Sequence, residues 1–208
     1  MKKIITFCVL VACSACSEKR EPNWTEIAWR VEAYANDPSP GNTKRAIAVL
    51  PKEQVSFSGS REESEANKKI YADKPMAVLE QQVLKRDQMS VEMVFLLLNI
   101  ADGAFAEDLD IILGKLVRIA PELFLSEMKS ANAPGIEQVV LEVSGTDEME
   151  GICEEWRLRK EALQTVQMTG LEAIKQRAIG VIEEELSSCG TEQAALHGAP
   201  KPTAPRRR

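Results

Sequence analysis

Residues 103–120 read GAFAEDLDIILGKLVRIA, and their apolar side chains repeat with the period of an α-helix. Phe105, Leu109, Ile112, Leu116 and Ile119 follow one another at alternating intervals of four and three residues. This spacing places all five on one side of a helix and leaves most of the charged residues on the other sides. The stretch therefore predicts an amphipathic helix with one buried face, and it carries the clearest such pattern in the chain.

Helical periodicity extends in both directions from this stretch, from residue 23 to about residue 188, and no run of alternating β-branched and aromatic residues predicts a strand. Asn23 or Thr25 is expected to cap the first helix, and Asp73 and Ser90 are expected to cap two later ones. Further helices are expected at 24–35, 43–50, 60–72, 73–83, 91–101, 121–128, 134–143, 148–168 and 170–188. We therefore expect an all-α fold, an irregular array or bundle of short antiparallel helices.

Two of these segments differ in character. Residues 91–101 are apolar on nearly all sides, which is typical of a central helix. Residues 60–72 are highly charged and only weakly amphipathic, so the pattern gives little reason to expect their burial. The stretch 89–129 resembles a HEAT or armadillo-like array, since short helices alternate there with Asp, Ser, Pro or Gly at the joints. That resemblance implies helix faces or grooves that bind peptides or proteins.

The N-terminus has the pattern of an export signal. Two lysines precede a run from Ile4 to Ala12 that is apolar except at Thr6, and this run is too short to span a bilayer, which takes about 20 apolar residues. Leu10-Val11-Ala12-Cys13 resembles the lipobox of bacterial lipoproteins. The resemblance implies cleavage before Cys13 and lipidation of its thiol. Cys16, preceded by Cys13-Ser14-Ala15, is the alternative attachment site.

The expected organisation follows from this leader. Residues 1–12, or 1–15, would be the signal peptide, 13–22 a lipidated tether, 23–189 the helical domain and 190–208 a disordered tail rich in Ala and Pro. Acyl chains such as palmitate would hold the protein to a membrane. Ser follows both candidate cysteines, which resembles lipoproteins sorted to the outer membrane, so we expect the domain to face the periplasm.

Export would place the remaining cysteines in an oxidising compartment. If residues 148–168 and 170–188 form a hairpin turning at Thr169-Gly170, Cys153 and Cys189 lie about 24 and 28 Å from the turn at 1.5 Å per residue. The two thiols could then approach bonding distance, so we expect a disulfide, with two buried free thiols as the alternative.

The composition argues against several chemistries. His197 is the only histidine and falls in the predicted tail, so no Ser-His-Asp triad, Cys-His dyad or His-rich zinc site is expected on an ordered scaffold. Acidic residues cluster at 107–110 and at 183–185. On a helix, consecutive acids within each cluster point in different directions, which is typical of solvated faces and does not bring them together on one substrate. We expect no catalytic residue, no metal site and no cofactor. The formal net charge of −6 also disfavours nucleic acid as a partner.

Three groups of residues are candidates for contacts within the domain or with other molecules. Trp24 falls on the apolar stripe of its helix and is expected to pack inside, while Trp29 falls off the stripe and could pack or contact a partner. Arg206-Arg207-Arg208 could touch anionic lipid, although a short flexible basic tail usually makes no specific contact. The favoured function is a non-enzymatic, lipid-anchored module that binds another envelope protein. The alternatives are an inhibitor or immunity-type lipoprotein and, less favoured, a carboxylate-based glycan hydrolase.

Overall fold

The computed structural model describes residues 21–131, 136–143 and 149–196 of the chain. Within these ranges the chain forms nine α-helices, two short 3-10 helices and no strand, which confirms the predicted all-α class. The elements are α1 (Trp24–Asn36), α2 (Pro40–Ile47), α3 (Arg61–Ile70), α4 (Asp73–Leu84), α5 (Gln88–Leu97), η1 (Leu98–Ile100), α6 (Gly103–Ile119), α7 (Pro121–Ala131), η2 (Ile136–Leu141), α8 (Met149–Gln164) and α9 (Glu172–Leu196).

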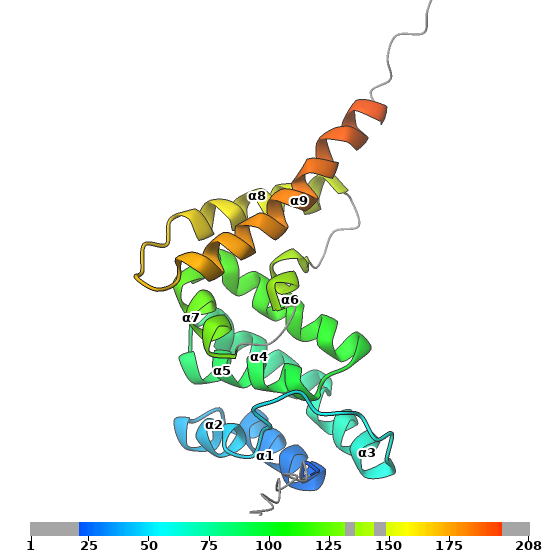
Figure 1. Cartoon of the computed structure of the whole chain (residues 1–208). Coiled ribbons are helices and arrows are strands. Elements are labelled where there is room, and N and C mark those ends of the chain that lie inside the picture. The colour runs from blue at the N-terminus through cyan, green and yellow to red at the C-terminus, as the bar shows by residue number, and fades with distance from the viewer. Residues whose placement is uncertain (1–20, 132–135, 144–148, 197–208) are drawn as a thin grey trace, which may run out of the picture.

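The helices form a stack with the two ends of the described chain at opposite ends (Figure 1). α1 packs against α2, α3 and α4 at one end, and α8 packs against α9 at the other. Between them, α5 and α6 contact each other and each also contacts α4 and α7, and α6 reaches α8 and η2 as well. The buried apolar residues form one continuous cluster from α1 to α9, so the stack is held by a single core.

α5 lies in the middle of this core, as its sequence predicts, and α6 buries the apolar stripe that its own sequence predicts. Leu109, Ile112 and Leu116 of α6 are buried, and Phe105 and Ile119 are partly buried against the same core. α5 buries residues on nearly all sides and packs against α2, α4, α6 and α7. The five-residue stripe along α6 therefore identifies a helix that packs both against α4 and α5 and against α8 and η2.

Two predicted caps are wrong, for different reasons. Asp87 rather than Ser90 caps α5, because the backbone N–H of Ser90 donates to Asp87 Oδ1 at 2.8 Å. Ser90 is buried instead, and its hydroxyl forms a 3.0 Å hydrogen bond with the Tyr34 hydroxyl. Asp73 is the first residue of α4 and Ala72 takes the cap position. At α1 the prediction is confirmed, because Asn23 accepts the backbone N–H of Glu26.

The charged helix α3 is docked on α1, contrary to the sequence-based expectation. Ala66 and Ile70 are buried, and so is Glu63. The Glu63 carboxylate accepts the backbone N–H groups of Ser58 and Gly59 at 2.9 and 3.1 Å. Its own N–H donates to Ser60 Oγ at 3.1 Å, so a buried acid here fixes the start of the helix. A pattern that counts only apolar residues misses a face that includes such an acid.

Several predicted boundaries shift. α2 begins at Pro40, because Pro suits the first position of a helix, and it ends at Ile47. The helix predicted at 134–143 is the shorter 3-10 helix η2, and residues 134 and 135 lie outside the described residues. α8 ends at Gln164 instead of residue 168. α9 begins at Glu172 and continues to Leu196, past the predicted helix end at residue 188.

Candidate protein-interaction surface

α1 and α3 present two matching rows of side chains along a shared groove. The residues from α1 are spaced three, four and seven positions from the first, and those from α3 repeat the same spacing, so each row lies on one face of its helix. The groove has a volume of about 340 Å³ and is lined by Thr25, Ala28, Trp29, Glu32, Glu62, Glu65, Ala66 and Lys69. We call this surface the α1–α3 groove.

Small side chains lie deepest in the α1–α3 groove. Ala28 of α1 and Ala66 of α3 are each 4% exposed and belong to the core. Because alanine has only a methyl group, the two helices pack closely here, and the longer residues beside each alanine rise as walls. The groove is therefore a consequence of where the two helices touch.

Trp29 is the most exposed large apolar side chain among the described residues, at 57%. The guanidinium carbon of Arg30 lies 4.4 Å from the centre of its ring, a cation–π contact. Arg30 also pairs with Glu26 at 3.3 Å on the same helix. Tryptophan is enriched among the residues that contribute most to binding at protein interfaces, so an exposed indole in the lining of a groove is a candidate contact residue.

Carboxylates dominate the walls of the groove. Glu62 accepts a 3.0 Å hydrogen bond from the Thr25 hydroxyl, and Glu65 pairs with Lys68 at 3.2 Å. Glu32 forms no hydrogen bond or ion pair with the rest of the described chain. The lining holds three carboxylates against the single ammonium of Lys69, an excess of negative charge that Lys68 beside Glu65 and Arg30 beside Trp29 offset in part.

A second cavity of about 470 Å³ lies where the described chain begins, between residues 21–24 and the loop 51–58. Asn99 holds this loop at two points: its side-chain amide donates to the Pro51 carbonyl at 3.0 Å, and its carbonyl accepts the Val55 N–H at 2.9 Å. The buried indole of Trp24 lines the cavity, so its predicted packing is confirmed. Because Glu21, the first residue that the structure describes, is part of the lining of this cavity, we take the α1–α3 groove as the candidate site.

The remaining predicted site residues fall into two groups. Cys153 of α8 and Cys189 of α9 form a disulfide with their Cα atoms 6.2 Å apart, so the predicted pairing is confirmed. Cys13, Cys16 and His197 lie outside the described residues.

No helix in the described ranges is long and apolar enough to cross a bilayer. Nor do histidines, cysteines and acids gather there in a group of three or more that could hold a metal ion.

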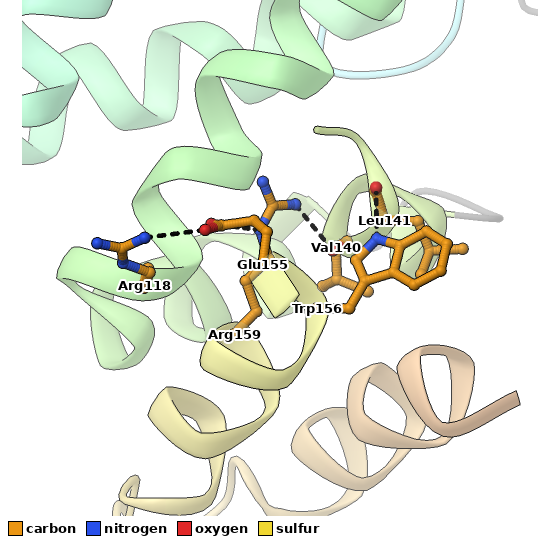
Figure 2. A network of polar contacts seen from close by, with 6 residues as sticks. All are labelled: Arg118, Val140, Leu141, Glu155, Trp156 and Arg159. Atoms are coloured by element: carbon orange, nitrogen blue, oxygen red, sulfur yellow. Dashed lines mark hydrogen bonds and ion pairs between the residues drawn. The ribbon is translucent and has the colours of Figure 1, made fainter. Parts of the chain in front are cut away.

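A network of polar contacts around the buried Arg159 joins α6, η2 and α8 (Figure 2). Arg159 is 2% exposed, and it donates to Glu155 at 3.2 Å and to the Val140 carbonyl at 2.9 Å. Glu155 also pairs with Arg118 at 2.8 Å, and the Trp156 indole donates to the Leu141 carbonyl at 2.8 Å. Each labelled group in this network faces a partner from the same chain, so it positions η2 against α8 instead of presenting groups to a ligand.

Asp110 is an acid on α6 whose pKa is raised well above its ordinary value. Burial on α6 is the main cause, and the negative charges of Glu142 and Glu107 add to it, which together raise the pKa to about 6. Its Oδ1 atom is buried without a hydrogen-bond partner in the described chain. A carboxyl alone does not make a catalytic pair, and Asp110 lines neither cavity described above.

Comparison with known proteins found no matching family model, no matching curated protein and no matching solved structure.

The α1–α3 groove does not follow from the sequence, which leaves the role of Trp29 open and gives no role to the residues of α3. One signal was available: Glu62, Glu65, Ala66 and Lys69 share a helix face. It does not say which helix that face would meet.

Proposed function

We propose that this protein is a lipid-anchored envelope lipoprotein whose helical domain binds another envelope protein through the α1–α3 groove. The observation that carries the proposal is the exposed Trp29, which stands beside a groove with an alanine floor and carboxylate walls. Binding would bury the indole, and tryptophans at the centre of an interface often contribute more than 2 kcal/mol of binding energy.

The position of the groove along the chain supports a partner close to the membrane. α1 begins at Trp24, directly after the proposed tether 13–22. Ten extended residues reach at most about 35 Å, so the tether would hold the start of α1 within about that distance of the anchored cysteine. The α8–α9 hairpin lies at the opposite end of the stack (Figure 1). A partner in or on the same membrane would therefore meet the groove end first.

The acidic walls of the groove also favour a second candidate, an inhibitor or immunity-type lipoprotein. Such a protein would cover the basic active-site rim of a secreted toxin or hydrolase. The two candidates share the groove and differ in the partner, because the first predicts a resident envelope protein and the second a secreted enzyme.

Site-specific photo-crosslinking in living cells tests the proposal. A benzoylphenylalanine residue replaces Glu32 or Lys69 in the groove, and the same residue replaces exposed Leu84 or Glu161 in matched controls on α4 and α8. We expect ultraviolet light to join one envelope protein to the groove positions and not to the controls, and we expect Trp29→Ala to remove that product. Mass spectrometry identifies the protein that is joined.

Equal crosslinking from all four positions, or none from Glu32 and Lys69, would contradict a docking site in the groove. A product that persists in Trp29→Ala cells would contradict the role given to the indole. Labelling with a fatty acid in cells that carry Cys13→Ala or Cys16→Ala tests the anchor separately, because loss of label identifies the attached cysteine. Unchanged labelling in both variants removes the lipoprotein part of the proposal.

A further inference from the structure

We infer that the partner segment bound in the α1–α3 groove is cationic, with an arginine or lysine side chain seated against Trp29 between the groove carboxylates. This inference rests on the proposed function and adds the chemistry of the partner. It follows from the charge of the walls, the accessibility of the indole and the shape of the floor, which are independent of one another.

The walls offer carboxylate oxygens that the protein itself leaves unused. Thr25 and Lys68 bond to Oε1 of Glu62 and Glu65, so the other oxygen of each has no partner in the described chain. Glu32 has both oxygens free by the same measure. An incoming ammonium or guanidinium group could bond to these oxygens, and such charge-assisted bonds are about twice as strong as neutral ones.

Trp29 supplies the second determinant. Its ring already holds one guanidinium, that of Arg30, at 4.4 Å, which places a cation over one face of the indole. An aromatic ring has two faces, and the 57% exposure of this side chain leaves ring surface free for another cation or its aliphatic stem. Arginine suits both contacts, because its planar group stacks on aromatic rings and pairs with carboxylates.

Other kinds of segment fit this groove poorly. An acidic segment would be repelled by three carboxylates. A purely apolar one would cover the alanine floor but would strip water from the carboxylates without replacing their hydrogen bonds, which is costly. A segment with apolar residues around one or two cations satisfies the floor and the walls together.

Calorimetric titration of the full chain with a defined peptide tests the inference. The probe is the capped peptide Gly-Ser-Arg-Ala-Ala-Ala-Arg-Ala-Gly-Ser, and the control peptides carry citrulline or glutamate in place of arginine. Citrulline keeps the shape of arginine and removes its charge. We expect the arginine peptide to bind and the citrulline peptide to bind about tenfold more weakly or not at all.

Variants of the protein locate the binding. Trp29→Ala and Glu62→Gln should each weaken the arginine peptide by about three- to tenfold. Leu84→Ala and Glu161→Gln, which change an exposed apolar residue and an exposed acid elsewhere, should leave the affinity unchanged. The double change Glu32→Lys with Glu62→Lys should reverse the preference, so that the glutamate peptide binds more tightly than the arginine peptide.

Three results would overturn the inference: no binding of the arginine peptide at about 1 mM, equal binding of the citrulline peptide, or equal weakening by Glu161→Gln, which would indicate unspecific attraction. Self-association of the chain that is lost on removing Arg206–Arg208 would also overturn it, because the occupant would then be a second copy. The proposed docking site and the proposed cationic partner can fail separately. If position 32 still crosslinks to one envelope protein but the arginine peptide does not bind, the docking site stands and its cationic partner does not.

Discussion

Gly114 of α6 lies directly against the guanidinium of Arg159 on α8. A Cβ atom at position 114 would be 2.7 Å from Arg159 Nη1 and 2.5 Å from the backbone oxygen of Glu142. These distances are too short for real Cβ contacts, and one of the atoms belongs to the backbone, which cannot swing away. The absence of a side chain at this position is therefore what lets a buried arginine lie between α6 and the segment that follows η2.

Gly114→Ala should lower the free energy of unfolding by about 1 to 3 kcal/mol, because the methyl group overpacks this junction. Gly180→Ala is the matched control, since a Cβ there meets nothing within 4 Å and the residue lies inside α9. The control should raise stability by about 0.5 to 1 kcal/mol, as alanine favours helix more than glycine does. Urea unfolding followed by circular dichroism measures both, and equal effects would contradict the steric argument.

Arg159→Ala should lower the free energy of unfolding by about 3 to 5 kcal/mol, because it empties a buried site and leaves the Val140 carbonyl without its donor. Arg159→Met should cost less, since it keeps most of the volume. Arg157→Ala provides the control. Arg157 precedes Arg159 by two positions, is half exposed, and forms an ion pair with the exposed Glu154. Ordinary surface substitutions change the free energy of unfolding by about 0.5 kcal/mol. A change no larger than this in Arg159→Ala would refute the structural role of Arg159.

Asp110 lowers the stability of the fold as the pH rises from about 4 to about 6. Its pKa is about 6 in the folded chain against an ordinary value of 3.8, so the folded state holds the proton more tightly than the unfolded state. The stability that this group contributes is complete below about pH 4 and is lost as pH rises through about 6.

Asp110→Asn should therefore raise the free energy of unfolding at pH 7 by about 1 to 2 kcal/mol and flatten its decline between pH 4 and 6. Asp108→Asn, a change to a neighbouring exposed acid, should keep the parent's profile. Chemical unfolding at a series of pH values distinguishes these outcomes, and an unchanged slope in Asp110→Asn would show that another group is responsible.

Cys153→Ala combined with Cys189→Ala should lower the free energy of unfolding by about 3 to 4 kcal/mol, because the bond closes a loop of 36 residues in the unfolded chain. Each single variant should lose the same amount to first order, since either change removes the bond. Adding a reductant should destabilise the parent and leave the double variant unaffected. A parent protein that does not respond to reductant would indicate that the bond contributes nothing to stability.

Periodicity predicted the helices whose burial depends on apolar residues alone. α6 has a regular stripe and α5 is apolar on most sides, so each could be placed without knowledge of its neighbours. The disulfide was predictable because it needs only the lengths of two helices and the turn between them. The burial of α3 does not follow from its apolar residues, because its buried face contains Glu63, whose carboxylate accepts hydrogen bonds from Ser58 and Gly59 in a loop outside the helix.

The candidate site was less accessible to sequence reasoning, for a geometric reason. A groove exists only where two faces meet, and the chain does not state that Ala28 will face Ala66, which lies 38 positions further along the sequence. The sequence did indicate that Trp29 lies off the apolar stripe. It could not indicate that acids from a different helix would surround the same indole.

The disulfide sits at the end of the α8–α9 hairpin away from the turn at 165–171. The two helices are thus joined at both ends, by peptide bonds on one side and by sulfur on the other, and residues 153–189 form a covalent ring. A protease that cuts one bond in the turn opens the ring without releasing a fragment. The cut chain would keep its mass on a non-reducing gel and separate into two pieces only when the sulfur bond is reduced.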